Sequence, residues 1–140
     1  MSSAKQLHGR CLCGAVEISA EAPNTQVGAC HCAMCRRWGG GPLLAIDCGS
    51  TPVFKGQDSI AYFKSSDWAQ RGFCRQCGSH LFYLLNDNQQ YIVPVGLFEG
   101  DPDYQFDHQI FIDEKPGFYD FANETKNMTG AEVFAQFAPT

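Results

Sequence analysis

The hydrophobic residues of this chain fall into short runs, and the clearest of them has the two-residue period of a half-buried β-strand. In this run Val16, Ile18 and Ala20 alternate with Glu17 and Ser19. Further short runs, rich in β-branched or aromatic residues, predict strands at 43–48, 53–55, 60–63, 81–85, 91–95 and 110–112. Turn residues end each run, so the pattern predicts a mainly β fold of short strands.

Two segments have helical rather than strand character. The first spans 33–38 and is stopped by three glycines at 39–41. The second spans 130–137, where Thr129 is the expected N-cap and Glu132 completes a capping box. Pro94 lies inside the run 91–95 and predicts that this strand is an edge strand or contains a bulge, because proline cannot donate a backbone hydrogen bond.

Length and composition narrow the class of protein. The 140 residues suit a single domain over 1–140, and the 10 basic against 15 acidic residues give a net charge of −5. This charge gives no basic field for nucleic acid, and no apolar run approaches the length of a membrane helix, so neither partner is expected. The polar residues 1–8 have no features of a secretory signal, which predicts a cytoplasmic protein with reduced thiols.

Eight cysteines carry most of the chemical information, because seven of them are tightly clustered. They form C-x-C at Cys11 and Cys13, C-x-C-x-x-C at Cys30, Cys32 and Cys35, and C-x-x-C at Cys74 and Cys77, with Cys48 alone. A disulfide within C-x-C closes too short a loop for relaxed geometry, whereas neighbouring thiolates can share a metal ion. The strand expected after Gly78 favours zinc over a thioredoxin-like dithiol at Cys74 and Cys77.

The number of cysteines predicts two unequal zinc sites. The two pairs complete one tetrahedral structural site, formed by Cys11, Cys13, Cys74 and Cys77. The three cysteines of the other cluster can hold a second zinc ion with an open fourth position, as in catalytic sites; these are Cys30, Cys32 and Cys35. Two alternatives remain: Cys48 could complete the second site and make it structural, or the three cysteines could form a redox switch without metal.

Four blocks of this sequence resemble the glutathione-dependent formaldehyde-activating enzymes, also called the centromere protein V family. The blocks are GRCLCG at 9–14, CHCAMCRR at 30–37, RGFCRQCGSHLF at 71–82 and KPGFYD at 115–120. The resemblance covers nearly the whole chain and implies a small zinc-binding fold of the β-tent type, with short antiparallel sheets and one or two short helices. It also implies a closed zinc site formed by Cys11, Cys13, Cys74 and Cys77. A second zinc site is implied at Cys30, Cys32 and Cys35, where glutathione and formaldehyde meet.

The function implied by this resemblance is that of a carbon–sulfur lyase or synthase. Its substrates would be a small-molecule thiol and an aldehyde, with S-(hydroxymethyl)glutathione as the adduct. The alternative is a non-catalytic two-zinc module that binds glutathione, another thiol ligand or a partner. Only the enzyme would accelerate the exchange of formaldehyde with glutathione, so an exchange measurement would distinguish the two alternatives.

Residues after the second cluster are candidates for contacts with the cosubstrate. Arg36 and Arg37 could offset the negative charge of the thiolates and hold glutathione carboxylates, or be an exposed helix face. Trp38 could form a pocket wall or pack in the core. His31 and His80 are interpreted as packed or hydrogen-bonding residues rather than metal ligands, because neither has ligand spacing of its own.

Overall fold

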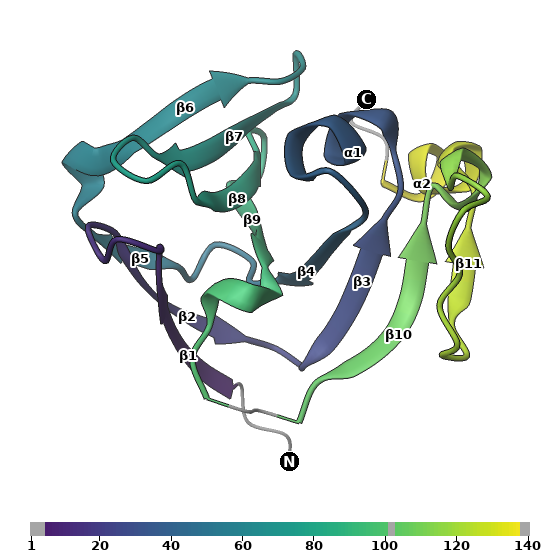
Figure 1. The fold of residues 1–140 in the computed structure, drawn as a ribbon, viewed down its shortest axis with the longest axis horizontal. Coiled ribbons are helices and arrows are strands. Elements are labelled where there is room, and N and C mark those ends of the chain that lie inside the picture. Colours follow the sequence, from purple (N-terminus) through teal and green to yellow (C-terminus); the bar gives the residue numbers. More distant parts are fainter. Residues whose placement is uncertain (1–4, 101–102, 138–140) are drawn as a thin grey trace.

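The strands of the computed structural model form two sheets, and the structure describes residues 5–100 and 103–137 (Figure 1). The smaller sheet is antiparallel and has the order β1 (Lys5–Arg10), β2 (Glu17–Ala22), β5 (Val53–Lys55). The larger sheet has the order β11 (Lys126–Met128), β10 (Gln105–Ile110), β3 (Gln26–Cys30), β4 (Leu43–Asp47), β9 (Gln90–Pro94), β8 (His80–Leu85), β7 (Ala69–Cys74), β6 (Ile60–Lys64). The fold is therefore mainly β, as predicted.

The larger sheet is mixed rather than wholly antiparallel as expected, because of strand β10. This strand pairs in parallel with both β3 and β11, whereas the other neighbours in this sheet pair antiparallel. Two helices, α1 (Ala33–Gly39) and α2 (Gly130–Phe137), and three short 3-10 turns, η1 (Gln57–Ser59), η2 (Val95–Leu97) and η3 (Ile112–Glu114), complete the described part. None of the helices in these ranges has the length and apolar character that crossing a membrane requires.

The hydrophobic core joins the smaller sheet to the larger one and is centred on Phe82. The Phe82 ring is fully buried, and its centroid lies 5.3 Å from that of Phe54 on β5 and 5.0 Å from that of Tyr91 on β9. Gly72 on β7 is the cross-strand partner of Phe82, and a Cβ atom at Gly72 would lie 2.2 Å from this ring. The central ring therefore requires glycine at its neighbour on β7.

Both predicted helices and the clearest predicted strand are confirmed. Val16, Ile18 and Ala20 are buried, whereas Glu17 and Ser19 are exposed. Helix α1 ends as expected, because its C-cap, Gly40, has a φ of 87°. At the start of α2 the Glu132 backbone N–H donates to the Thr129 hydroxyl over 3.1 Å, and the Thr129 N–H donates to the Glu132 carboxylate over 2.8 Å.

Two details of the sequence prediction are wrong. The strand expected at 110–112 ends at Ile110, because Phe111 adopts a left-handed conformation with a φ of 54° and a 3-10 turn follows. The strand that contains Pro94 is an interior strand, between β4 and β8, rather than an edge strand. Proline is tolerated because it is the last residue of β9, beyond Ile92, where the pairing with β8 ends.

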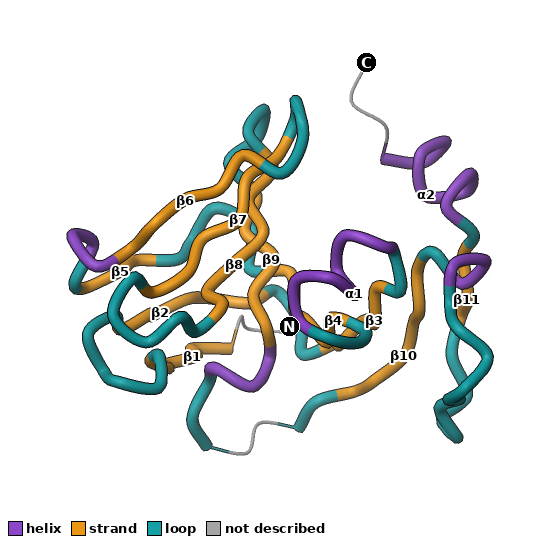
Figure 2. The backbone as a smooth tube through the Cα atoms, turned by 45° about the horizontal axis from the view of Figure 1, so that its top comes forward, coloured by secondary structure: helices purple, strands orange, loops and turns teal. Residues whose placement is uncertain are grey.

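Helix α1 contains Cys35 of the second cysteine cluster, and Cys32 of the same cluster is its N-cap. The helix follows β3 directly, and both views place it between the β8–β9 part of the large sheet and the strands β10 and β11 (Figures 1 and 2). The parallel pairing of β3 with β10 sets Cys30 opposite Ile110, and the His31 N–H donates to the Ile110 carbonyl over 3.2 Å. The position of the cluster therefore depends on strands far apart in sequence.

Candidate metal centres

The first cluster unites two turns that are about sixty residues apart in the chain. The sulfur atoms of Cys11, Cys13, Cys74 and Cys77 all lie within 4.8 Å of one another. The Cys13 sulfur lies 3.7 Å from that of Cys11 and 3.8 Å from that of Cys74, far beyond the disulfide bond length of about 2.05 Å. A tetrahedron with metal–sulfur bonds of about 2.3 Å has edges of about 3.8 Å, so these four thiols fit a metal ion that prefers tetrahedral thiolate ligands.

Local backbone geometry explains why these turns present sulfur atoms. Gly14 and Gly78 have φ values of 80° and 79°, and these left-handed residues reverse the chain after each pair of cysteines. Backbone N–H groups then point at sulfur, from Val16 to Cys11 over 3.3 Å and from Gln76 to Cys74 over 3.4 Å. Such donors stabilise thiolates, as expected for ligands of a cation.

A serine hydroxyl links the two turns of the first cluster. Ser79 Oγ accepts a hydrogen bond from the Leu12 N–H over 3.0 Å and lies 3.2 Å from the Cys77 sulfur. Because the oxygen already accepts from Leu12, its own hydrogen is free to point at the sulfur. Hydrogen bonds from Ser79 lower the pKa of Cys77 to about 5, which favours its thiolate form at neutral pH.

The second cluster is built at the junction of β3 and α1. Its sulfur atoms, those of Cys30, Cys32 and Cys35, all lie within 4.8 Å of one another. Cys32 is the N-cap of α1, and its sulfur accepts a hydrogen bond from the Cys35 N–H over 3.4 Å. Hydrogen bonds from Cys30 and Cys35 lower the pKa of Cys32 to about 2, whereas hydrogen bonding to Cys32 and Cys35, together with burial, raises the pKa of Cys30. One of the three sulfurs is therefore held as a thiolate by its neighbours.

The eighth cysteine belongs to neither cluster. Cys48 is fully buried in the hydrophobic core, and burial raises the pKa of its thiol to about 12. Its sulfur is not among the ligand atoms that lie within 4.8 Å of one another in either cluster, and its neighbours are apolar core residues. The geometry disfavours the alternative in which Cys48 completes the second site.

Arg71 on β7 is the main functional residue that the sequence interpretation did not identify. Its side chain is almost fully buried, and its Nη1 and Nη2 atoms lie 3.7 Å and 3.6 Å from the Cys35 sulfur. The guanidinium carbon also lies 4.9 Å from the ring centroids of both Trp38 and Tyr83. A buried arginine needs a negative partner, and the thiolates of the second cluster provide one. The sequence offered one indication of Arg71, its position as the first residue of the block RGFCRQCGSHLF at 71–82.

The structure places the predicted cosubstrate residues on α1 but in different environments. Arg36 donates through Nε to the His31 carbonyl over 3.0 Å, whereas Arg37 is exposed. Trp38 stacks on His80 with ring centroids 3.9 Å apart and a 12° angle between the planes. Arg71, rather than either predicted arginine, contacts the Cys35 sulfur. The positive charge nearest this sulfur therefore comes from strand β7 and not from helix α1.

A pocket of about 260 Å³ adjoins the second cluster. We call it the Trp38 pocket, and its lining residues are Met34, Arg37, Trp38, Phe63, Ser65 and Arg71. Arg71 connects the pocket to the Cys35 sulfur, and Met34 and Trp38 come from the same helix as Cys35. No cysteine lines the pocket, so a molecule held in it would lie beside Arg71, whose guanidinium contacts the Cys35 sulfur.

His31 is a packed, hydrogen-bonded residue, as the sequence interpretation expected. It is fully buried, and its Nε2 lies 2.7 Å from the Gln109 Oε1. Because Oε1 can only accept, Nε2 carries hydrogen, and Nδ1 accepts from the Tyr119 hydroxyl over 2.7 Å. Burial lowers the pKa of His31, which favours this neutral form. The chain continues from Gln109 Nε2 to Thr125 Oγ1 over 2.8 Å, so the ring is fixed from two sides.

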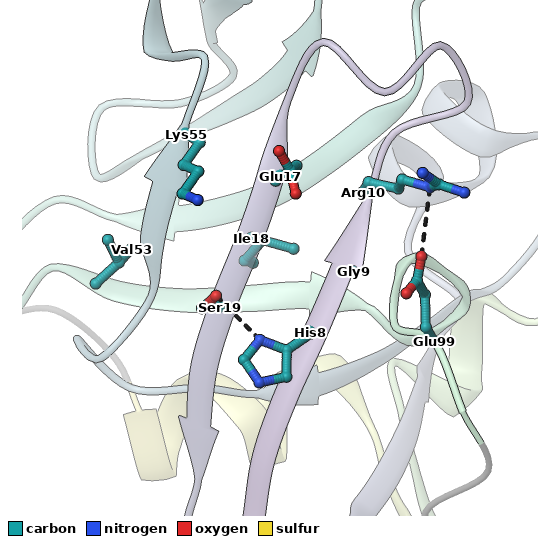
Figure 3. Close-up of a pocket in the computed structure, with 9 residues that line it drawn as sticks. All are labelled: His8, Gly9, Arg10, Glu17, Ile18, Ser19, Val53, Lys55 and Glu99. Atoms are coloured by element: carbon teal, nitrogen blue, oxygen red, sulfur yellow. Dashed lines mark hydrogen bonds and ion pairs between the residues drawn. The ribbon is translucent and has the colours of Figure 1, made fainter.

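A larger hollow of about 400 Å³ lies over β1, β2 and β5 (Figure 3). Four of its charged and polar side chains bond to one another in pairs, with an Arg10–Glu99 ion pair at 3.3 Å and a His8–Ser19 hydrogen bond at 3.1 Å. No cysteine of either cluster lines this hollow or the Trp38 pocket, but only the Trp38 pocket has a lining residue, Arg71, that contacts a cluster sulfur. The Trp38 pocket is therefore the better candidate for chemistry.

Comparison with known proteins identifies the family. The model of the glutathione-dependent formaldehyde-activating enzyme family matches residues 6–114. An uncharacterized lyase of Schizosaccharomyces pombe is 36% identical over 129 residues, covering 91% of this chain and 94% of its own. A crystal structure of a Rhodobacter sphaeroides protein matches with a TM-score of 0.59 and 30% identity, covering 69% of this chain and 91% of its own. The chain therefore belongs to the glutathione-dependent formaldehyde-activating enzyme family.

Proposed function

We propose that the protein is a zinc-dependent carbon–sulfur lyase or synthase that interconverts formaldehyde and glutathione with S-(hydroxymethyl)glutathione. The observation that carries the proposal is the set of three sulfurs, one short of a tetrahedral ligand set, beside an arginine and a pocket. Membership of the family supports glutathione and formaldehyde as substrates, and the relative named a lyase supports the reaction class.

The two cysteine clusters suit two zinc ions with different roles. Cys11, Cys13, Cys74 and Cys77 would hold a structural ion, and Cys30, Cys32 and Cys35 a second one; thiolate-only donor sets favour zinc over magnesium or calcium. Zinc bound by the second cluster would supply a position where an incoming thiol is kept deprotonated near neutral pH.

The residues around the second cluster then supply charge balance and confinement. In the reaction the glutathione sulfur forms a bond to the carbonyl carbon, the C=O double bond becomes a C–OH single bond, and the thiol proton is replaced by one on that oxygen. Arg71 offsets negative charge beside Cys35, and the exposed Arg37 can reach a glutathione carboxylate at the pocket rim. The Trp38 pocket would hold the aldehyde beside Arg71, which contacts the Cys35 sulfur, and such confinement near the cluster would favour addition by proximity.

The proposed activity is tested by exchange NMR of formaldehyde with glutathione, with and without the protein. We expect the protein to increase the exchange rate above that of the unaided reaction. Glutathione binding with no increase in exchange would contradict the proposed enzyme and favour the non-catalytic binding module.

Replacement of Arg71 by methionine is expected to weaken metal binding at the second cluster by about 10- to 100-fold. The reason is that the variant keeps an unbranched apolar stem but removes the positive charge within 4 Å of the Cys35 sulfur. Metal content after dialysis against a competing chelator measures the effect, with Lys64→Met on the exposed surface as the control. An Arg71→Met protein that retains the second ion as tightly as the wild type would show that this charge is not needed.

A further inference from the structure

The Trp38 pocket is much larger than formaldehyde requires. Formaldehyde has two heavy atoms and a size close to that of water, whose share of liquid volume is about 30 Å³. The pocket volume is about 260 Å³. Formaldehyde alone would leave most of this space to water, so the proximity argument favours a larger aldehyde.

The lining of the pocket is apolar in character with positive charge at two points. Met34, Trp38 and Phe63 supply large hydrophobic side chains, and the Phe63 side chain is 63% exposed. Arg37 and Arg71 supply the charge, and the six described lining residues include no aspartate or glutamate. An apolar group attached to an anionic molecule complements such a lining.

An aromatic ring suits this surface better than an extended polar chain. Trp38 already stacks on His80 and has the Arg71 guanidinium carbon 4.9 Å from its ring centroid, so Phe63 and the polarizable side chain of Met34 are the apolar surfaces that a ligand ring would contact. Phe63 belongs to the outermost strand of the large sheet, β6, and so brings an exposed ring opposite the helix α1. Leaving this ring in water has no folding benefit, whereas a ligand ring placed against it would bury both.

We propose that the Trp38 pocket holds an aryl group on the aldehyde-derived part of a glutathione adduct, so that the substrate class is aromatic aldehydes. The inference rests on the proposed function, because it names the substrate of the same site. The addition is balanced in the same way as with formaldehyde: the sulfur–carbon bond forms, the carbonyl becomes a carbinol, and no oxidant or reductant is needed. Arg37 lies at the rim, where it can pair with a glutathione carboxylate while the ring enters the pocket.

Two thioether analogues test binding separately from turnover. S-benzylglutathione carries the aryl group and S-methylglutathione carries a one-carbon group, and titration calorimetry on the metal-loaded protein compares their affinities. We expect S-benzylglutathione to bind at least about tenfold more tightly, because burial of a ring is worth more than one factor of ten. Phe63→Ala should reduce this ratio at least about threefold, whereas Val53→Ala, which shortens an exposed side chain on β5, should leave it unchanged.

Exchange NMR supplies the second readout, with benzaldehyde and formaldehyde as alternative partners for glutathione. We expect a larger acceleration for benzaldehyde, and a loss of this preference in Phe63→Ala. Equal affinities for the two analogues, with formaldehyde exchange accelerated, would overturn the aryl specificity and leave the proposed function intact. Tighter binding of the benzyl analogue with neither exchange accelerated would overturn the proposed function and support an aryl-binding site.

Discussion

Replacing Cys77 with serine is expected to leave the protein aggregated or sensitive to protease. Binding of a structural zinc ion contributes on the order of 10 kcal/mol, and this energy is also folding energy. The total stability of a domain is about 5–15 kcal/mol, so loss of this site removes most of it. The effect should be large here because the cluster joins the β1–β2 turn to the β7–β8 turn.

Limited proteolysis and thermal unfolding measure this effect. Gln76→Ser is the matched control, because Gln76 is exposed and lies between the two cysteines of the same turn. It should behave as the wild type. A soluble Cys77→Ser protein with wild-type melting behaviour would refute the structural assignment of this cluster.

Replacing Cys32 with serine is expected to separate function from folding. Cys32 is the N-cap of α1 and a member of a three-sulfur group, so its loss should empty the second site. The first cluster still joins its two turns, so the variant should fold and bind about one zinc ion per chain. It should neither retain glutathione nor accelerate adduct formation, which metal analysis and exchange NMR would measure.

Cys48→Ser is the informative comparison for Cys32→Ser. A serine hydroxyl in the apolar surroundings of Cys48 is expected to reduce stability by about 1–3 kcal/mol. It should nevertheless leave two zinc ions in place, because the Cys48 thiol lies outside both clusters. Equal zinc loss in the Cys48 and Cys32 variants would overturn the open-site interpretation and support a second structural site.

The sequence predicts strands best where β-branched and aromatic residues dominate. The run at 53–55 coincides with β5, and 81–85 lies within β8. In contrast, β1 and β3 were not predicted, because each contains a glycine where another backbone or ring packs closely. A Cβ at Gly9 would lie 2.2 Å from the Leu97 carbonyl oxygen, and one at Gly28 would lie 2.1 Å from the His108 ring. These glycines are explained by tertiary contacts, which a local pattern does not contain.

The same distinction applies to the site. The cysteine groups were predictable because metal ligands repeat at short fixed spacings, and counting them suggested how the pairs combine. Arg71 and Gln109 were not, because their importance depends on β7 and β10 passing beside α1 and His31. A buried polar residue can be recognised only when its partner, distant in sequence, is known.

The two clusters also differ in when their ligands become available during protein synthesis. The second cluster is complete within six residues, 30–35, whereas the first requires Cys77. At about 5–20 residues per second, translation reaches Cys77 roughly 2–8 seconds after Cys35. The proposed catalytic ligands are therefore the first complete set to emerge from the ribosome, before β10 exists to position them. Under the proposed assignment, the site with the larger contribution to stability would be the later of the two to gain all its ligands.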